Sequence, residues 1–291
     1  MLKIDEREGL YRFRHEAMAT ELVLSLGGVD ADYARQAAQA FFARVDEVEA
    51  KLSLYQESSD VTRINLLEAG TETRVSEECV DCLQVAMLAS GLTGERFHPF
   101  LGRESLRRKG GEPFFLKHLM AGEGALKGSP AIEIDPEKRR VIKLGEGMVL
   151  DFGGIGKGFA LDCAMEEIED WEVPIAMANF GGSTLLFRGE EREGAWTGTL
   201  CGEALQPFCS GAISSSGVGF QGEHIVGSEI RWDRSFARCQ SAAMADALTT
   251  GAMLMSESEL DALGAAESGL ALAATCSSIN WGVKPFCSWK A

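Results

Sequence analysis

The spacing of apolar and polar residues changes several times along the chain, and these changes predict an alternation of strands and helices. Residues from about Arg12 to Leu26 alternate enough to predict a first strand. From Tyr33 to Leu54 the apolar residues fall on one helical face, which predicts a long helix. A second helix is predicted from Ser76, which is suited to cap it, to about Leu92. Glu77 and Glu78 would complement the positive end of its dipole.

The second half of the chain alternates more quickly between short elements. A β-hairpin is predicted from Ala131 to Leu144, because Asp135 and Pro136 favour a turn. Short strands are expected near residues 148–150, 175–179, 184–187, 196–200 and 212–214. Helices are expected near residues 157–168 and through the apolar positions Met244, Leu248 and Met255. No internal repeat and no Pro/Ser linker interrupts the pattern, so residues 1–291 are predicted to form a single α+β domain.

The charge of the chain narrows the classes of partner. The 28 Lys and Arg against 44 Asp and Glu give a formal net charge of -16, which disfavours general nucleic-acid binding. The N-terminal residues mix charges throughout, as no signal peptide does, and no later apolar run approaches the length that spans a bilayer. The expected location is therefore the cytoplasm, without a transmembrane segment.

Eight cysteines occur in the chain, and without an export signal they are expected to be reduced thiols. Cys79 and Cys82 form a C-x-x-C pair, which raises the alternatives of a zinc site or a redox motif. A zinc site needs further ligands, and a thioredoxin-like motif needs a preceding strand. Because this pair follows a predicted helix start instead, both cysteines are expected to be small core residues.

The strongest local signal is the glycine cluster in Leu150–Asp162, with the sequence LDFGGIGKGFALD. A strand that runs through glycines and Lys157 into a helix offers backbone amides and a helix N-terminus to an anion. Its spacing matches neither a P-loop nor the Rossmann G-x-G-x-x-G. A tight strand-to-helix turn that only packs against a neighbour remains the alternative.

Asp246 and Thr250 are four residues apart in a predicted helix, so they share one face. A carboxylate and a hydroxyl in this arrangement suit Mg²⁺, which takes few protein carboxylates and fills its sphere with water and phosphate oxygens. The alternative is purely structural: Asp246 favours the helix dipole and Thr250 hydrogen-bonds a carbonyl.

A run of serines at 214–216 and the later His224 invite a nucleophile-and-base interpretation. The chain has no G-x-S-x-G motif, however, so a serine hydrolase is a minor alternative. The four histidines are scattered at positions 15, 98, 118 and 224, and this spacing disfavours a histidine-rich zinc site.

Taken together and in order, several segments resemble the ApbE family, the FAD:protein FMN transferases. The matching segments are Met18-Ala19-Thr20, Leu52–Asn65, Phe97–Gly102, Leu150–Asp162, Asn179–Gly182, Ser215–Gly217, His224–Val226 and Ala245–Thr250. The resemblance covers most of the chain. It implies an α+β fold related to the T-fold, with antiparallel sheets and packed helices.

The resemblance also implies an activity: Mg²⁺-dependent transfer of the FMN half of FAD to a Ser or Thr hydroxyl of a target flavoprotein, with release of AMP. The metal ligands implied are the side chains of Asp246 and Thr250 and the carbonyl of Gly156. Mg²⁺ on Asp246 would stabilise the charge that develops on the departing AMP. The positions implied for FAD binding are Met18, Tyr55, Lys157, Gly181, Gly182, Ser183, Ser216 and His224. A homodimer is left open.

His224 corresponds in place to the family's proposed catalytic histidine, and an imidazole can accept the proton of an attacking hydroxyl near neutral pH. A packing role within a strand is the alternative. Several positions depart from the family pattern: Gln56, His98 and Ser183 stand where acids are usual, and Gly227-Ser228 replaces Asp-Pro or Asn-Pro. Two further functions therefore stay open, namely a non-catalytic flavin-binding protein and an FAD pyrophosphatase that gives FMN and AMP.

Overall fold

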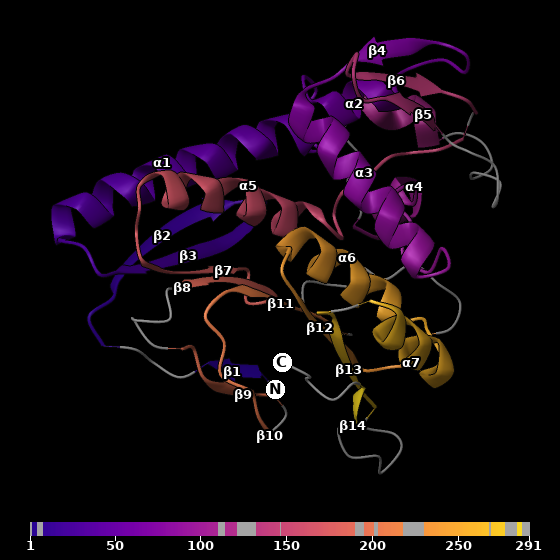
Figure 1. Cartoon of the computed structure of the whole chain (residues 1–291). Helices are drawn as coiled ribbons and strands as arrows, with labels where there is room; N and C mark the ends of the chain where they lie inside the picture. Colours follow the sequence, from indigo (N-terminus) through magenta and orange to yellow (C-terminus); the bar gives the residue numbers. More distant parts are fainter. Residues whose placement is uncertain are drawn as a thin grey trace.

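The computed structural model describes most of the chain, and its central element is a large antiparallel sheet (Figure 1). The described residues are 2–4, 8–109, 114–120, 132–145, 147–189, 195–200, 203–217, 230–267, 269–276 and 284–286. Within them the sheet has eight strands, in the order β14 (Lys284–Phe286), β13 (Ala271–Thr275), β12 (Arg234–Cys239), β11 (Gly211–Gly217), β8 (Thr184–Gly189), β7 (Ile175–Phe180), β3 (Thr20–Gly27) and β2 (Tyr11–Ala17). Each neighbouring pair is antiparallel.

Helices cover one face of this sheet. They are α1 (Ala31–Leu52), α5 (Gly156–Asp170) and α6 (Ala242–Ala252), with α5 packed between the other two (Figure 1). The opposite face carries a small sheet of β1 (Leu2–Ile4), β9 (Gly198–Leu200) and β10 (Glu203–Ala204). A continuous apolar core lies between the sheet and the helices, and a second cluster lies beneath the sheet around Trp196 and Phe187.

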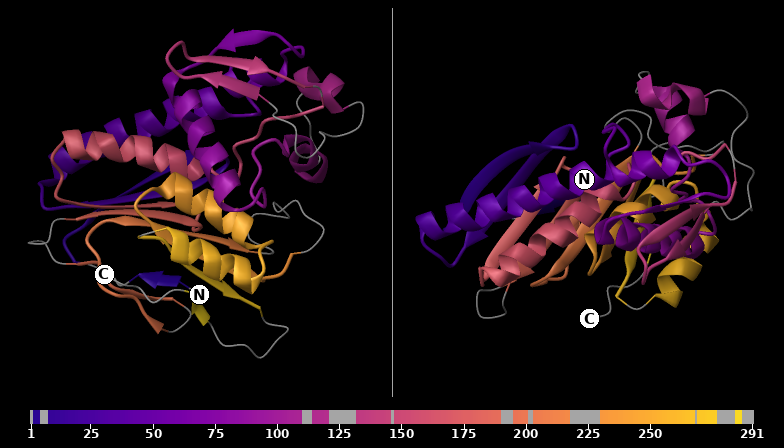
Figure 2. Two further views of the ribbon diagram at one scale, coloured as in Figure 1. Left: turned by 45° about the vertical axis from the view of Figure 1, so that its right-hand side comes forward. Right: turned by 90° about the horizontal axis from the view of Figure 1, so that it is seen from above.

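The remaining elements gather beyond the end of α1, as the two views of Figure 2 show. They are α2 (Asp60–Asn65), α3 (Glu77–Leu92), α4 (Gly102–Lys109), the 3-10 helix η1 (Phe114–Met120) and a sheet in the order β4 (Glu72–Arg74), β6 (Arg140–Lys143) and β5 (Ile132–Asp135). Helix α7 (Glu257–Ala266) follows α6. None of the described helices is both long and apolar enough to cross a membrane.

The prediction of one strand over Arg12–Leu26 is wrong, because the segment folds into the hairpin β2–β3. Its two-residue turn is Met18-Ala19, with φ of 48° and 59°. Such turns usually contain Asn or Gly, since both central residues need positive φ, and these two residues gave no such signal. The amide of Met18 donates to Glu49 Oε2 at 2.8 Å, which fixes the turn to α1.

Most helix predictions are confirmed within a few residues. Ser76 caps α3 through a hydrogen bond from Cys79 N at 3.2 Å, and Cys79 and Cys82 are buried core residues with free thiols. Burial raises the pKa of both thiols. The helix predicted through Met255 instead ends at Ala252. The predicted fold class, α+β with antiparallel sheets and packed helices, is confirmed.

Candidate functional site

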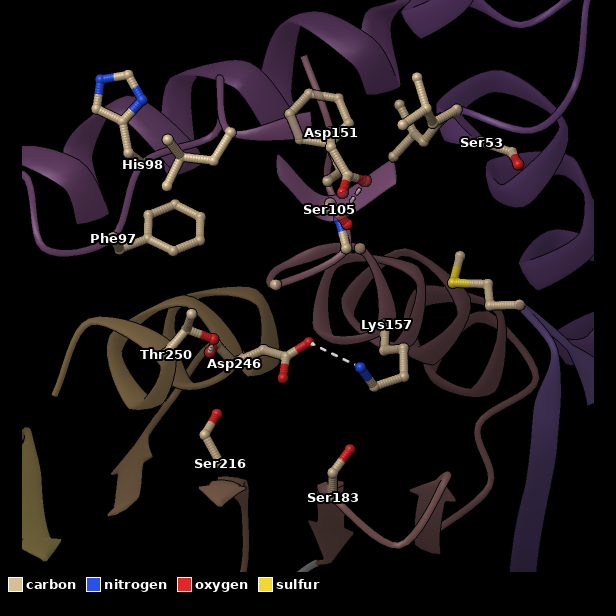
Figure 3. Close-up of a pocket in the computed structure, with 18 of the residues that line it drawn as sticks. Ser53, Phe97, His98, Ser105, Asp151, Lys157, Ser183, Ser216, Asp246 and Thr250 are labelled. Atoms are coloured by element: carbon tan, nitrogen blue, oxygen red, sulfur yellow. Dashed lines mark hydrogen bonds and ion pairs between the residues drawn. The ribbon is translucent and has the colours of Figure 1, made fainter. Parts of the chain in front are cut away.

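A pocket of about 390 Å³ opens where the end of α1, the glycine cluster, α6 and two strands of the large sheet meet (Figure 3). Figure 3 shows Lys157 and Asp246 facing each other, with Ser183 and Ser216 below them from the sheet. The charged and hydroxyl-bearing residues that line it are Glu49, Ser53, Tyr55, Arg96, His98, Ser105, Asp151, Lys157, Ser183, Ser215, Ser216, Asp246 and Thr250. The pocket therefore combines both signs of charge with many neutral hydroxyl groups.

The glycine cluster enters the pocket as a loop held at its start. Leu150, just before the loop, is bound by the side chain of Asn65: Asn65 Nδ2 donates to Leu150 O at 2.9 Å, and Leu150 N donates to Asn65 Oδ1 at 2.7 Å. Asp151 Oδ1 then accepts from Gly153 N at 3.0 Å, which closes a local turn. The loop ends at Gly156, the first residue of α5.

The fourth glycine of the cluster, Gly158, brings two helices together. A Cβ on Gly158 would lie 2.1 Å from Ala242 O, so only glycine permits this approach of α5 to the start of α6. The amide of Gly158 donates to Asp246 Oδ2 at 3.3 Å. Glycine at this position therefore allows α5, which follows the glycine loop, to lie against the helix that carries Asp246.

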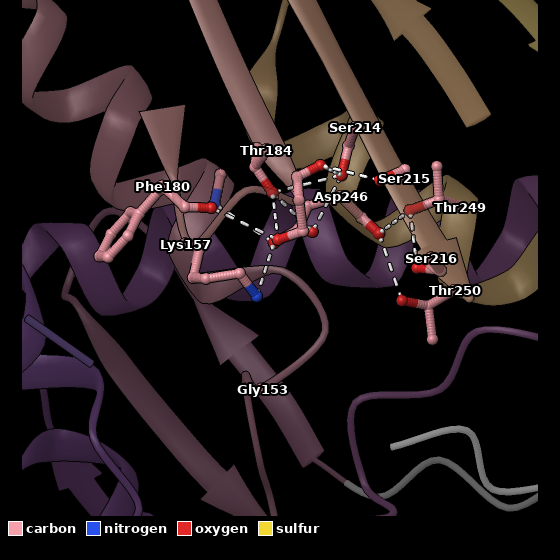
Figure 4. Close-up of polar contacts among 12 residues, drawn as sticks. Gly153, Lys157, Phe180, Thr184, Ser214, Ser215, Ser216, Asp246, Thr249 and Thr250 are labelled. Carbon is pink, nitrogen blue, oxygen red and sulfur yellow. Dashed lines mark hydrogen bonds and ion pairs between the residues drawn. The ribbon is translucent and has the colours of Figure 1, made fainter. Parts of the chain in front are cut away.

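Asp246 is the centre of the polar contacts at the pocket floor (Figure 4). Asp246 is only 4% exposed, and its Oδ1 accepts hydrogen bonds from Thr184 Oγ1 and Ser214 Oγ, both at 3.1 Å. Thr184 and Ser214 are direct register partners on β8 and β11, so the two hydroxyls stand side by side. Lys157 Nζ lies 3.8 Å from Asp246 Oδ2. The buried carboxylate is thus compensated by hydroxyl, amide and ammonium groups.

Thr250 lies one turn after Asp246 and lines the same pocket, as the spacing predicts. Its Oγ1 donates to the backbone carbonyl of Asp246 at 3.3 Å. The alternative that Thr250 hydrogen-bonds a helix carbonyl is therefore also met by a contact in the structure. The glycine loop passes close to it, since a Cβ on Gly154 would lie 3.2 Å from Thr250 Oγ1. The helix face and the loop therefore converge on one point.

The donor set at this point fits Mg²⁺. Asp246 Oδ2 has one long hydrogen bond and an ion pair at 3.8 Å, so it keeps capacity to accept from the pocket side. The carboxylate and the hydroxyl of Thr250 are hard oxygen donors, and Mg²⁺ commonly completes such a set with water and phosphate oxygens. In the part of the chain that the structure describes, no three His, Cys, Asp or Glu side chains form a metal cluster.

The structure brings most of the predicted site residues into this pocket. Those that line it are Met18, Tyr55, Gly156, Lys157, Ser183, Ser216, Asp246 and Thr250. Gly181 and Gly182 are not among the described lining residues. They form the turn between β7 and β8 with φ of 62° and 69°, next to Ser183. His224 and the substituted Gly227-Ser228 lie outside the described residues.

Two of the positions that depart from the family pattern are part of the pocket wall. His98 and Ser183 both line it, whereas Gln56 does not. His98 Nδ1 accepts from Phe100 N at 3.3 Å, so the ring closes its own turn beside Pro99. Ser183 Oγ donates to Phe180 O at 3.4 Å. A base and a neutral hydroxyl therefore stand where the family pattern has acids.

The serine run serves the sheet and the pocket floor. Ser215 Oγ donates to Ser183 O at 3.4 Å, and Ser216 Oγ donates to Thr249 Oγ1 at 3.0 Å. Neither hydroxyl is hydrogen-bonded to a histidine among the described residues. In these contacts Ser215 and Ser216 act as neutral hydrogen-bond donors at the bottom of the pocket.

Sequence reasoning missed several residues that shape the site. The sequence predicts Thr184 only as a strand position and Ser214 as a strand position within the serine run, although both bind Asp246. The sequence predicts Glu49 only as part of a helix, although its carboxylate accepts from Met18 N and it lines the pocket. A polar residue in an otherwise buried strand is the signal that marks Thr184 and Ser214, because such a group needs a partner.

Fold and pocket together define a class: an antiparallel α+β protein in which a glycine loop meets a buried carboxylate. A model of the ApbE family matches residues 18–202, more than half of the chain, and the chain belongs to this family. No curated protein matches it.

Three solved structures show the same fold. The flavinyl transferase ApbE of Pseudomonas stutzeri, in its apo form, has a TM-score of 0.75 at 18% identity, over 95% of each chain. The ApbE protein of Thermotoga maritima has a TM-score of 0.74 at 20% identity, over 95% of this chain and 96% of that one. The flavin transferase ApbE of Vibrio cholerae has a TM-score of 0.74 at 18% identity, over 97% and 96%.

Proposed function

We propose that the protein is an Mg²⁺-dependent FAD:protein FMN transferase. The observation that carries the proposal is the convergence, in a chain of the ApbE family, of the glycine loop with Asp246 and Thr250 at one pocket. The neighbours described as flavin transferases supply the reaction class. Mg²⁺ would neutralise charge on the diphosphate and on the departing AMP.

The proposed site residues divide into two groups by role. Asp246 and Thr250, with the carbonyl of Gly156, would hold the metal. The positions proposed for FAD are Met18, Tyr55, Lys157, Gly181, Gly182, Ser183, Ser216 and His224. Lys157 is a fitting phosphate partner, because its ammonium group lies at the floor and is only loosely paired with Asp246.

The proposed transfer exchanges one phosphorus–oxygen bond for another. A Ser or Thr hydroxyl of the target flavoprotein attacks the FMN phosphorus, the bond between that phosphorus and the AMP oxygen breaks, and AMP leaves. The hydroxyl proton passes to a general base, for which His224 remains the candidate. We also propose that residues 1–291 form one domain that acts in the cytoplasm.

The experiment is chromatographic measurement of AMP and FMN from FAD, with and without Mg²⁺ and a Ser/Thr acceptor peptide. We expect AMP only when both are present, together with a fluorescent flavinylated peptide. AMP and free FMN without peptide would instead identify an FAD pyrophosphatase. FAD that binds and stays intact would identify a flavin-binding protein, the function that neutral or basic residues at Ser183 and His98 favour.

The metal assignment is tested by Asp246→Ala, with Asp170→Ala as the matched control. Asp170 is an exposed carboxylate at the end of α5, remote from the pocket lining. We expect Asp246→Ala to abolish Mg²⁺-dependent FAD binding while Asp170→Ala keeps it. Equal FAD affinity of both variants, with and without chelator, would contradict the assignment.

A further inference from the structure

Asp162 connects the helix of the glycine loop to the helix that carries Asp246. It lies on α5, and its carboxylate accepts from the first two amides of α6: Ala242 N at 2.8 Å to Oδ1 and Ala243 N at 2.9 Å to Oδ2. Ser241 Oγ donates to Oδ2 at 2.7 Å. Three short hydrogen bonds therefore run from one side chain to the start of a neighbouring helix.

These contacts complete the cap of α6. The amides at a helix start lack partners within the helix, and Ser241 supplies one of them through its hydrogen bond from Met244 N at 3.1 Å. Asp162 supplies the partners of the two preceding amides, and its negative charge also complements the helix dipole. The cap is therefore shared between a residue of the helix itself and a residue from α5.

The same two helices meet a second time, one turn away on each of them. Gly158 precedes Asp162 by four residues on α5, and Asp246 follows Ala242 by four residues on α6. The close approach of Gly158 to Ala242 and the hydrogen bond from Gly158 N to Asp246 lie between these positions. Rotation or sliding of α6 would break the contacts at both turns.

From this geometry we infer that Asp162 is a positioning residue for the metal site. It fixes the rotation of α6 about its axis and the position of α6 along that axis relative to α5, so that Asp246 and Thr250 face the glycine loop. Asp162 acts through the backbone of α6, since Gly158 rather than Asp162 contacts Asp246. This inference rests on the proposed function, because it concerns the metal that Asp246 would hold.

The test measures binding of Mn²⁺, used in place of Mg²⁺, by electron paramagnetic resonance in the presence of FAD. Asp162→Asn keeps the size of the side chain but turns one of its two acceptors into a donor that faces an amide. We expect its Mn²⁺ affinity to fall at least about tenfold. Ser241→Ala removes one of the three hydrogen bonds to Asp162, together with the cap hydrogen bond from Met244 N, and is expected to give a smaller loss in the same direction.

A matched control separates positioning from general stability. Ser76→Ala removes the side-chain cap of α3, which carries none of the pocket-lining residues. It should lower the thermal midpoint as a lost cap does, but leave Mn²⁺ affinity unchanged. If Asp162→Asn and Ser241→Ala both bind Mn²⁺ like wild type, the positioning role is wrong. If the wild-type protein itself binds neither Mn²⁺ nor FAD, the proposed function fails instead.

Discussion

Asn65 and Leu150 are joined by two hydrogen bonds across 85 positions of the chain, one from the side chain to the carbonyl and one from the amide to the side chain. Asn65 is buried at the end of α2, and Leu150 immediately precedes the glycine loop. Lys143 Nζ adds a hydrogen bond to the carbonyl of Asn65 at 3.1 Å. The approach of the loop to the pocket is thus fixed from α2, a helix outside the main layers.

Replacement of Asn65 by Ala should destabilise the protein. It leaves a buried amide and a buried carbonyl of Leu150 without these partners, which costs about 2–4 kcal/mol of unfolding free energy. Urea unfolding measures the change. Asn65→Asp keeps the acceptor for Leu150 N, but it sets a carboxylate oxygen against Leu150 O and buries a charge, so we expect it to lose at least as much stability as Asn65→Ala. A wild-type midpoint in Asn65→Ala would show that water replaces the carboxamide.

Gly158→Ala should separate α5 from α6. The new Cβ would lie 2.1 Å from Ala242 O, so the helices must move apart at a cost of roughly 1–3 kcal/mol. The control is Gly91→Ala on α3, where the structure places nothing within 4 Å of the new Cβ. There the gain in helix propensity should add up to about 1 kcal/mol. Thermal unfolding of both variants decides, and a similar effect of the two would contradict the close contact.

The hydroxyls that bind Asp246 should matter more than an equally buried hydroxyl with a neutral partner. We expect Ser214→Ala and Thr184→Val to cost about 1.5–3 kcal/mol each, because each removes a hydrogen bond to a buried carboxylate. Ser235→Ala is the matched control on the adjacent strand, since Ser235 Oγ donates to the neutral carbonyl of Thr249 at 2.7 Å. It should cost about 1 kcal/mol. Equal losses in urea unfolding would mean that the charge of Asp246 contributes nothing.

Glu78 should make the stability of the protein depend on pH. Burial acts to raise the pKa of Glu78, but hydrogen bonds from Lys51 and Arg44 outweigh it and lower the pKa from 4.5 to about 2. The folded state then favours the ionised form, so this stabilisation is complete above the unfolded pKa of 4.5. It is lost as the pH falls from there through about 2.

The variant Glu78→Gln isolates this contribution, because other acids with lowered pKa, such as Glu259, remain in both proteins. We expect wild type to be the more stable at about pH 6, and the difference between the two to shrink at about pH 3. Urea unfolding at both pH values measures it. A difference that stays constant with pH would contradict the ion pairs that join α1 to α3.

Much of the fold and of the site could be predicted from interactions between residues that are close in the sequence. The cap at Ser76, the helix after the glycine cluster, and the shared face of Asp246 and Thr250 all depend on neighbours within about one helical turn. The hairpin turn at Met18-Ala19 was not predicted, because the turn contains neither Asn nor Gly. There the long-range hydrogen bond from Met18 N to Glu49 overrides the weak local preference.

The sequence by itself determined the fold class, the order of most helices and strands, and the residue types that point to a metal and an anion, since these follow from periodicity, caps and short motifs. Only the tertiary structure decided which strands are neighbours and which partners surround Asp246. Thr184, Ser214 and Gly158 come from β8, β11 and α5, and 32 to 88 positions separate them from Asp246. Contacts between residues so far apart in the sequence produce no periodic pattern along the chain, because they form only when the helices pack onto the sheet.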